Sequence, residues 1–220
     1  MDLKQAKQQC VEFGRRIAAL GLVVGPGGNL SLRVGEQILV KASGAAFEDA
    51  GPDDYVAVGL ADGGCESAGR RPTSEVLMHR KCYEVRPDIG AVVHTHSPFA
   101  TGVASSGTPL QTMYPDFAAL IGSDVPTVAY VVPTGTELAS AVGEVIGSAN
   151  AALLANHGVV AVGANMREAF YRAVLVEEAA KSLVAACTVG TPRFLTHEEI
   201  DEVRRLQAET YRIGLIRNSE

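Results

Sequence analysis

The chain has 220 residues, 47% of them hydrophobic, and a net charge of −6. That length fits one domain of generous size, and the apolar fraction is sufficient to fill its core. Because the 19 Lys and Arg residues form no cluster, the sequence excludes the basic surface that nucleic-acid binding requires. No segment approaches the roughly 18 consecutive apolar residues of a membrane-spanning helix.

The first residues and the cysteines bear on cellular location. The N-terminal segment lacks the apolar core of a signal peptide. The four cysteines are scattered and form no C-x-x-C pair, which is typical of reduced thiols in a cytosolic protein. We therefore expect a cytoplasmic protein without disulfides, and no nucleic-acid or membrane partner.

The first third of the chain predicts one helix followed by short strands. Apolar side chains recur with helical spacing over residues 3–20, and a glycine-rich loop follows at 25–29. Gly35 and Glu36 suit the turn of a hairpin between the first two of the expected strands. These strands are expected at 30–34, 37–40 and 55–60.

The remaining two thirds of the chain mix helices and strands. A helix is expected from Pro72 to about Val85, capped by Thr73 or Ser74. Further strands are expected at 91–94, 127–132, 151–155 and 159–162. Further helices are expected at 99–105, 115–120, 135–146 and 167–187, and a last one begins at a Thr196–Glu199 capping box. The helix at 167–187 is expected to carry Glu177, Glu178 and Lys181 on its solvent-exposed side. Since helices and strands do not alternate strictly, the pattern favours an α/β fold with a mixed or antiparallel sheet and helices on its faces.

Three histidines indicate a metal site. His94 and His96 lie at the end of an expected buried strand, where residues i and i+2 point the same way and can reach one ion. His157 follows another short apolar strand, and two strand ends of one sheet can lie side by side. Three imidazoles with one open position are the pattern of catalytic zinc. The alternatives are that one histidine of the first pair caps its strand while the other is exposed, and that His157 is a polar residue of a tight turn.

Glu75 is the expected fourth member of this site. We expect it in the first turn of a helix, where the helix dipole favours a carboxylate. It can act as a metal ligand or a catalytic base, or it can simply complete a cap. The other two histidines, His79 and His197, are expected on helix surfaces or at a cap, and no role is assigned to them.

Three turns of small residues suit an anion. Each offers backbone N–H groups or hydroxyls, although any one of them alone is more commonly a plain turn. No Walker or dinucleotide motif is present, so a nucleotide is not indicated. The three turns are Gly27-Gly28-Asn29, Ser43-Gly44 and Thr73-Ser74.

Five motifs follow one another in a familiar order and spacing. They are Gly27-Gly28-Asn29-Leu30-Ser31, Lys41-Ala42-Ser43-Gly44, Thr73-Ser74-Glu75, His94-Thr95-His96-Ser97 and Asn156-His157-Gly158. Together they resemble the class II aldolase/adducin family, and most of all its L-fuculose-phosphate aldolases. The resemblance extends over residues 5–212 or so and implies a single three-layer α/β/α domain over residues 1–220, with a mixed, largely antiparallel central sheet.

The resemblance also implies a ligand set. It places one Zn2+ per chain, replaceable by Mn2+ or Co2+, on His94, His96 and His157, with Glu75 beside it. The implied phosphate-binding residues are Asn29, Ser43, Gly44, Thr73 and Ser74. Pro26 is a departure, because a hydroxyl residue is common at that position.

In aldolases of this family a tyrosine from a neighbouring subunit donates a proton. Tyr130 falls at the matching place, although the segment from Tyr130 to Gly135 is one residue longer than expected. Tyr211 is the candidate for a C-terminal tyrosine that also reaches the site. The family implies a fourfold cyclic homotetramer with its sites at subunit interfaces.

The implied reaction is the cleavage of a ketose 1-phosphate, such as L-fuculose 1-phosphate, to dihydroxyacetone phosphate and an aldehyde through a metal-stabilised enediolate. In the synthetic direction Glu75 would remove a proton from the carbon beside the carbonyl, and Tyr130 would protonate the aldehyde oxygen as the new bond forms; in cleavage Glu75 would return that proton. Keto-acid decarboxylases and a methylthioribulose-phosphate dehydratase share this chemistry and stay open. A 4-epimerase is disfavoured, since that branch tends to carry Asp in place of Glu75. A non-catalytic adducin-like scaffold is disfavoured because the metal residues are all present.

Overall fold

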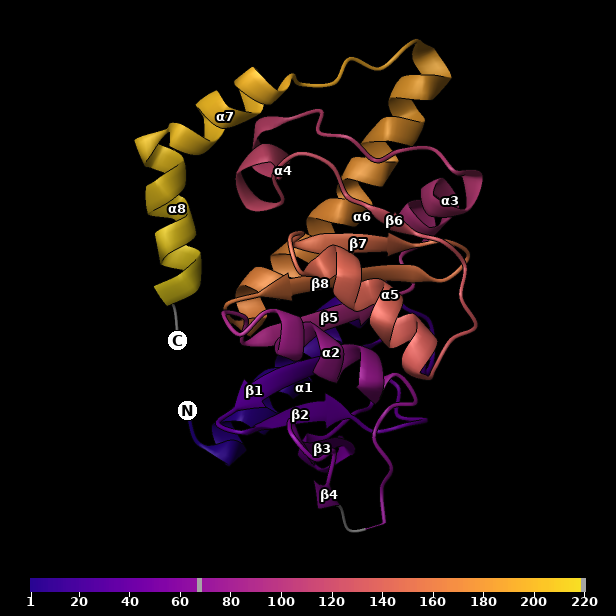
Figure 1. Ribbon diagram of the computed structural model, residues 1–220, viewed down its shortest axis with the longest axis vertical. Coiled ribbons are helices and arrows are strands. Elements are labelled where there is room, and N and C mark those ends of the chain that lie inside the picture. The colour runs from indigo at the N-terminus through magenta and orange to yellow at the C-terminus, as the bar shows by residue number, and fades with distance from the viewer. Residues whose placement is uncertain (67–68, 219–220) are drawn as a thin grey trace.

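The computed structural model describes residues 1–66 and 69–218, and one eight-stranded sheet forms its centre (Figure 1). The strands are β1 (Asn29–Val34), β2 (Gln37–Lys41), β3 (Tyr55–Gly59), β4 (Cys65–Glu66), β5 (Ala91–Thr95), β6 (Thr127–Val128), β7 (Ala151–Leu154) and β8 (Gly158–Gly163). Their order across the sheet is β4-β3-β2-β1-β5-β8-β7-β6. Among these described strands β6 and β7 pair in parallel and the other neighbours pair antiparallel, which confirms the predicted mixed, largely antiparallel sheet.

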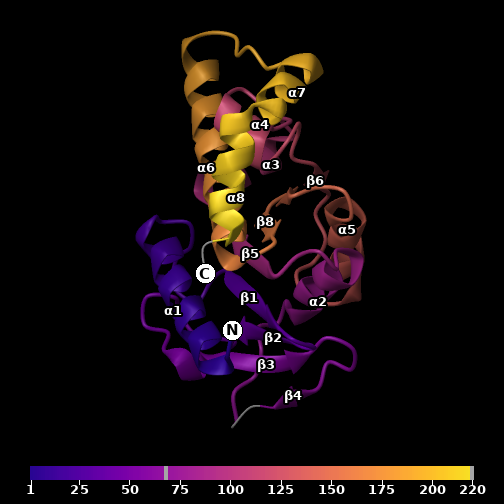
Figure 2. The ribbon, with the colours of Figure 1, turned by 90° about the vertical axis from the view of Figure 1, so that its left-hand side faces the viewer.

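Helices cover both faces of the sheet and complete three layers (Figure 2). The helices are α1 (Leu3–Ala19), α2 (Val76–Val85), α3 (Pro98–Ser106), α4 (Pro115–Leu120), α5 (Thr136–Ile146), α6 (Met166–Val189), α7 (His197–Arg205) and α8 (Gln207–Asn218), with a short 3₁₀ turn at Pro52–Asp54. The core of one face contains residues of α1, α3, α4 and α6, and the core of the other contains residues of α2 and α5.

Strand alternation distributes the apolar residues between these two cores. Along β5, Ala91 and Val93 belong to the first core, whereas Val92 belongs to the second. Because both faces are covered, β7 and β8 are continuous apolar runs, whereas β1 alternates apolar residues with Asn29, Ser31 and Arg33. No helix within the described residues combines the length and the apolar character that spanning a bilayer requires.

Three predicted elements have clearly different bounds in the structure. The helix expected from Pro72 begins at Val76. The strand expected at 127–132 ends at Val128, because β6 lies at the sheet edge and its one neighbour, β7, ends at Leu154, the partner of Val128. The last helix of the sequence prediction is two helices in the structure. Extended backbone at Leu206 ends α7. The two helices contact different partners, since α7 packs against α4 and α8 packs against α6. The Thr196–Glu199 capping box at the start of α7 is confirmed.

The carboxylate of Glu177 in α6 is buried, although the sequence pattern predicts it on the solvent-exposed side of the helix. Glu177 is 1% exposed, and its two oxygens accept the backbone N–H groups of Phe99 and Ala100 at 3.3 and 2.9 Å. The prediction was wrong because the first N–H groups of α3 have no partner within that helix and need an acceptor from elsewhere. Glu177 thereby fixes the start of α3, which begins two residues after His96.

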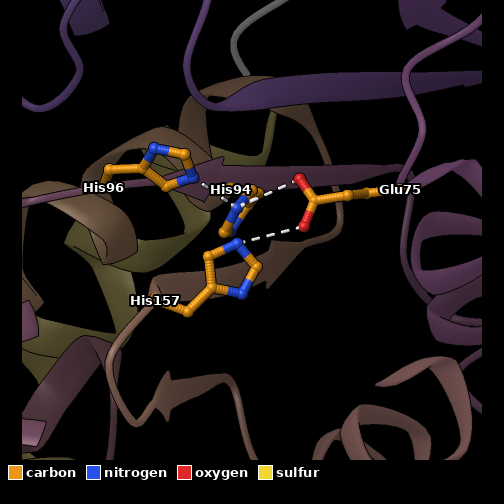
Figure 3. A group of neighbouring side chains, drawn as sticks. All are labelled: Glu75, His94, His96 and His157. Atoms are coloured by element: carbon orange, nitrogen blue, oxygen red, sulfur yellow. Dashed lines mark hydrogen bonds and ion pairs between the residues drawn. The ribbon is translucent and has the colours of Figure 1, made fainter. Parts of the chain in front are cut away.

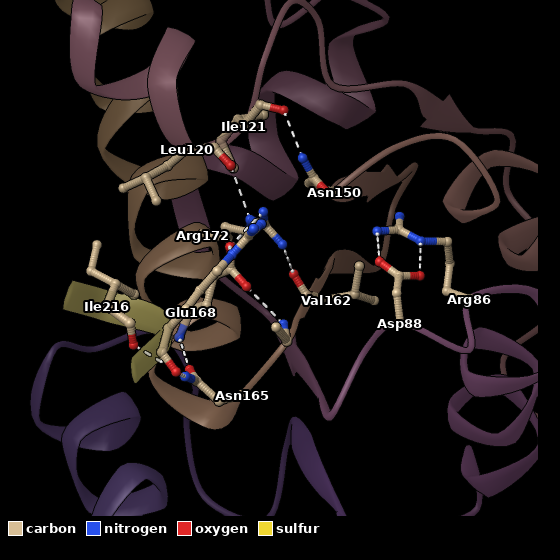
Figure 4. Close-up of polar contacts among 12 residues, drawn as sticks. Arg86, Asp88, Leu120, Ile121, Asn150, Val162, Asn165, Glu168, Arg172 and Ile216 are labelled. Carbon is tan, nitrogen blue, oxygen red and sulfur yellow. Dashed lines mark hydrogen bonds and ion pairs between the residues drawn. The ribbon is translucent and has the colours of Figure 1, made fainter. Parts of the chain in front are cut away.

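A second carboxylate of α6 ties the C-terminal helix to the sheet layer (Figure 4). Glu168 is fully buried and pairs with Arg172 at 2.9 Å and with Arg217 of α8 at 3.0 Å. Arg172 also donates to the carbonyls of Leu120 and Val162, at 2.9 and 2.6 Å. Because Asn165 donates to the carbonyls of residues 216 and 217, α8 is held at the N-terminal end of α6.

Candidate metal centre and substrate cavity

The three histidines come together because β8 begins where β5 ends. Thr95, the last residue of β5, pairs with Val159 of β8, so the turn before β8 lies beside the end of β5. The neighbour of β5 is therefore β8, not the apolar strand β7 that precedes His157 in the sequence. A Cβ at Gly158 would lie 2.1 Å from the carbonyl oxygen of Thr95, so this close approach requires glycine.

Four side-chain ligand atoms converge at this point (Figure 3). The Nε2 atoms of His94 and His96 lie 3.1 Å apart. Glu75 places Oε2 at 3.3 Å from His94 Nε2 and Oε1 at 3.1 Å from His157 Nε2. Two ligands of a tetrahedral zinc ion, each about 2.0–2.1 Å from the metal, are themselves roughly 3.3 Å apart. The ligand atoms of all four residues lie within 4.8 Å of one another, so one divalent ion can contact them.

Hydrogen bonding and burial within the cluster also suit a cation. His94 Nδ1 donates to the carbonyl of Val159 at 2.9 Å, which turns its Nε2 towards the cluster. Burial, with the charges of His94 and His157, lowers the pKa of His96 to about 4 and favours its neutral form. Burial by itself raises the pKa of Glu75, but the charge of His94 and hydrogen bonds from His157, His94 and Asn29 outweigh it and hold that pKa below its usual range. Imidazole nitrogens and one carboxylate are a donor set that fits a divalent ion.

Glu75 does not serve as a cap. It is the N-cap residue of α2, one position before the expected first turn, and its side chain makes no capping hydrogen bond. The carboxylate is instead turned towards the histidines and is nearly buried. This placement removes the alternative that Glu75 only completes the helix end.

The three small-residue turns meet in a cavity of about 160 Å³ beside the cluster. Two of them are joined directly, since Ser43 donates its backbone N–H to Arg71 O and Thr73 donates to Lys41 O, both at 2.9 Å. Glu75 and His96 lie in the wall of this cavity, so the metal cluster and the turns share one space. The remaining lining residues are Pro26, Gly27, Gly28, Asn29, Lys41, Ala42, Ser43, Gly44, Thr73 and Ser74.

Lys41 is a cavity residue to which the sequence analysis assigns no role. It is 2% exposed, and its Nζ donates to the carbonyls of Pro26 and Ala45 at 2.8 and 2.5 Å. Burial lowers its pKa to about 8, although Glu48, Asp54 and Glu75 oppose this by Coulombic attraction. The sequence could have indicated a role for Lys41, because it lies directly between an apolar strand and an expected phosphate-binding turn and a phosphate attracts a cation.

His79 lies in a different environment from the one that the sequence predicts. The sequence assigns it to a helix surface, and this was wrong, because its side chain is fully buried between α2 and β1 and bonded to Asn29 and Ser31. Its spacing could have indicated this burial, since His79 lies four residues after Glu75 and therefore on the same helix face. His197, in contrast, begins α7 directly after the Thr196 cap.

The two tyrosines assigned by resemblance lie outside this cavity in the single chain. Tyr130 follows β6 and is 57% exposed, and Tyr211 lies in α8 and is 71% exposed. Neither lines the cavity beside the cluster.

Comparison with known proteins decides the family. The model of the class II aldolase and adducin N-terminal domain matches residues 8–184. The chain belongs to this family. The family contains metal-dependent lyases, so the chain is an enzyme of the class II aldolase type, and the Glu75–histidine cluster is a group that can hold its ion.

Three similar proteins illustrate the range of the family. A 5-methylthioribulose-1-phosphate/5-deoxyribulose-1-phosphate aldolase of Rhodospirillum rubrum is 35% identical over 194 residues, covering 88% of this chain and 86% of that protein. A 5-deoxy-D-ribulose 1-phosphate aldolase of Bacillus thuringiensis is 33% identical over 207 residues, covering 93% and 96%. A solved L-fuculose 1-phosphate aldolase superposes with a TM-score of 0.87 at 30% identity, covering 94% of this chain and 96% of that one.

Proposed function

We propose that this protein is a divalent-metal aldolase that cleaves a ketose 1-phosphate to dihydroxyacetone phosphate and an aldehyde. The observation that carries the proposal is the shared cavity, in which Glu75 and His96 lie beside three turns suited to an anion. A ligand chelated at the histidines could extend its phosphate into these turns without leaving that space.

The substrates after which the similar proteins are named share their phosphorylated end. Each is a 2-ketose with its phosphate on C1. Aldol cleavage breaks the bond between C3 and C4, because C3 is the carbon next to the carbonyl and C4 carries the hydroxyl that becomes the aldehyde. The phosphorylated fragment is therefore dihydroxyacetone phosphate in every case, and the substrates differ only beyond C3.

The cavity residues are suited to that common fragment. We assign the phosphate to the hydroxyls and backbone N–H groups of the three turns, with the Lys41 ammonium supplying positive charge nearby. The assigned residues are Asn29, Ser43, Gly44, Thr73 and Ser74, all of which line the cavity.

The metal and the proton carriers complete the proposed site. His94, His96 and His157 would hold Zn2+, for which Mn2+ or Co2+ can substitute, with Glu75 next to it. When bound, the ion supplies a Lewis acid for the substrate oxygens. Glu75 moves the proton at C3, a role that contributes about 10²–10⁴-fold in rate for a well-placed general base. Tyr130 of a neighbouring subunit is proposed to take up the proton of the C4 hydroxyl during cleavage and to return it to the aldehyde oxygen in the reverse reaction. Tyr211 is a further proposed substrate contact, and these roles require the homotetramer.

Carbon–carbon bond formation tests this proposal most directly. Purified protein is incubated with dihydroxyacetone phosphate and, separately, acetaldehyde, methylthioacetaldehyde or lactaldehyde, which would give a 5-deoxypentulose, a 5-methylthiopentulose or a 6-deoxyhexulose 1-phosphate. We expect a coupled product with at least one aldehyde, and none with the His96→Ala variant. A protein that makes no such product but dehydrates a methylthioribulose phosphate, or releases CO2 from a keto acid, would refute the aldolase assignment.

A further inference from the structure

A continuous polar chain leads from Glu75 into the interior of the protein. Asn29 and Ser31 are two residues apart on β1 and point to the same face, where they meet α2. Glu75, His79 and Tyr83 are spaced by four residues and form one stripe of that helix segment. All five side chains are buried, so their hydrogen bonds are made within the protein.

The five side chains are joined by an unbroken series of short contacts. Asn29 Nδ2 lies 2.8 Å from Glu75 Oε2 and 3.0 Å from Thr73 Oγ1. Asn29 Oδ1 lies 2.5 Å from His79 Nε2, and His79 Nδ1 lies 2.7 Å from Ser31 Oγ. Tyr83 OH ends the series, 2.9 Å from Ser31 Oγ and 3.0 Å from Ser31 O.

The chemistry of Glu75 fixes the direction of the first two bonds. An ionised carboxylate can only accept hydrogen bonds, so the Asn29 atom that faces it must be the amide nitrogen. The amide oxygen of Asn29 then faces His79, and it can only accept as well. His79 must therefore donate from Nε2.

The direction of the remaining bonds follows from the neutrality of His79. Burial, with the charge of His94, lowers the pKa of His79 to about 3, so the ring carries a single N–H. With that proton on Nε2, Nδ1 is a bare acceptor and the Ser31 hydroxyl must donate to it. Tyr83 has one hydroxyl proton, which it shares between the Oγ and the carbonyl oxygen of Ser31. The hydrogen bonds from Ser31 through His79 and Asn29 to Glu75 therefore all point towards the carboxylate.

We propose that His79 is a positioning residue that acts through Asn29 to hold the Glu75 carboxylate in place for proton transfer. This rests on the function proposed for Glu75. If the donor at His79 Nε2 were lost, the Asn29 amide could turn over and present its oxygen to the carboxylate. The two acceptors would repel each other, and Glu75 would lose its fixed orientation.

The tautomer of His79 tests the directional argument without any turnover. Protein labelled with 15N-histidine is examined by long-range 1H–15N correlation, with His79→Gln used to assign the ring. We expect the neutral Nε2–H tautomer for His79 at pH 7. A neutral Nδ1–H tautomer, or a doubly protonated ring, would overturn the proposal even if the protein proved not to be an aldolase.

The effect on Glu75 is tested with His79→Leu, which lacks the donor, and His79→Gln, whose amide can replace it. Losing such an outer-shell partner typically costs about 10–100-fold in activity. We expect His79→Leu to slow kcat and the exchange of the C3 proton of dihydroxyacetone phosphate with deuterated water by that factor, with KM and bound metal little changed. His79→Gln should recover most of this loss.

A matched control separates positioning from packing. Met78 is the buried neighbour of His79 on α2 and takes no part in the polar chain. Met78→Leu should therefore keep parent kcat, whatever its melting temperature. If His79→Gln is as slow as His79→Leu while Met78→Leu is also slow, the effect is one of helix packing and the proposal is wrong. If the parent protein itself exchanges no C3 proton, the proposed function fails, and the tautomer measurement still decides the direction of the chain.

Discussion

His94 and His96 bring their Nε2 atoms within 3.1 Å of each other from alternate positions at the end of one strand. The Nδ1 of His94 is already engaged as a donor to a backbone carbonyl, so its Nε2 presents a lone pair in the neutral ring. If Nε2 of His96 also presents a lone pair, the two nitrogen atoms repel each other. A shared cation removes that repulsion, and it also offsets the cost of burying the Glu75 carboxylate.

Metal removal should therefore lower both activity and stability. We expect about one divalent ion per chain in the purified protein, with its loss in His96→Ala. An ion present at 100 times its dissociation constant stabilises the fold by about 2.7 kcal/mol. For a chain of this size a chelator should lower the melting temperature by roughly 5–10 °C. His197→Ala, at an exposed helix start, is the control, and an unchanged melting temperature with full activity after chelation would contradict the site.

The part of the site that the sequence could predict depends on local geometry. Alternation along a strand is enough to place His94 and His96 on one side, and a glycine after His157 marks a tight approach. The elements themselves were predictable where apolar periodicity is strong, as in α1, the β1–β2 hairpin and α6.

The part of the site that the sequence could not predict depends on contacts between segments that are distant in the sequence. Lysine and histidine are ordinarily exposed, so nothing local indicates that Lys41 is enclosed by the carbonyls of Pro26 and Ala45. Glu177 is buried for the same kind of reason, because the start of α3 lies against it. The pairing of β5 with β8 is likewise a property of the whole sheet order.

Phosphate binding should depend on the charge of Lys41. Because its pKa is lowered to about 8, Lys41 is mostly cationic at pH 7 and loses its proton as the pH rises past that value. The affinity for dihydroxyacetone phosphate, measured by calorimetry from pH 7 to 9.5, should fall through that range. Lys41→Met should weaken binding at pH 7 by about 10–100-fold, the equivalent of one hydrogen bond to a charged group, and should remove the pH step.

Fold stability should change with pH in the opposite direction. The pKa of Lys41 in the folded chain is about 8, below the ordinary value of 10.5, so the unfolded chain binds more protons between these values. This lysine therefore contributes increasing stability as the pH rises from about 8 to 10.5. Lys81→Met is the control for both measurements, since Lys81 pairs with Glu84 at the surface. Phosphate affinity that is unaffected in Lys41→Met would exclude the lysine from anion binding.

Glu168 should be required for stability rather than for chemistry. Its replacement by Gln leaves Arg172 buried with no carboxylate partner, which typically costs about 3–5 kcal/mol. Urea unfolding should show a loss of that size. Asp201→Asn breaks only an exposed pair with Arg205 and should cost about 0–1 kcal/mol. Equal effects of the two substitutions would show that the Glu168 pair does not hold α8 in place.

Assembly should be required for full activity if Tyr130 serves a neighbouring subunit. Its exposed position and its absence from the cavity of its own chain are compatible with that role. We expect a homotetramer by light scattering. Tyr130→Phe and His94→Ala should each be inactive alone, and mixing them should restore partial activity in hybrid tetramers. A fully active monomer, or mixtures that stay inactive although subunits exchange, would place the proton donor elsewhere.

The last prediction separates the two roles open to Glu75, catalytic base and metal ligand. The two carboxylate oxygens lie 3.3 and 3.1 Å from imidazole nitrogens of His94 and His157, so geometry alone allows either role. Glu75→Gln preserves size and can still bond to Asn29, but it cannot take up a proton. If Glu75 is the base, the three imidazoles should retain the ion, dihydroxyacetone phosphate should still bind, and exchange of its C3 proton should slow by about 10²–10⁴-fold. If Glu75 is mainly a ligand, the variant should lose metal affinity instead, and added zinc should recover much of the rate. We expect the first outcome, because three imidazoles already suffice to hold a catalytic ion. Near-parent exchange in a variant shown to contain its metal would assign the base to another group.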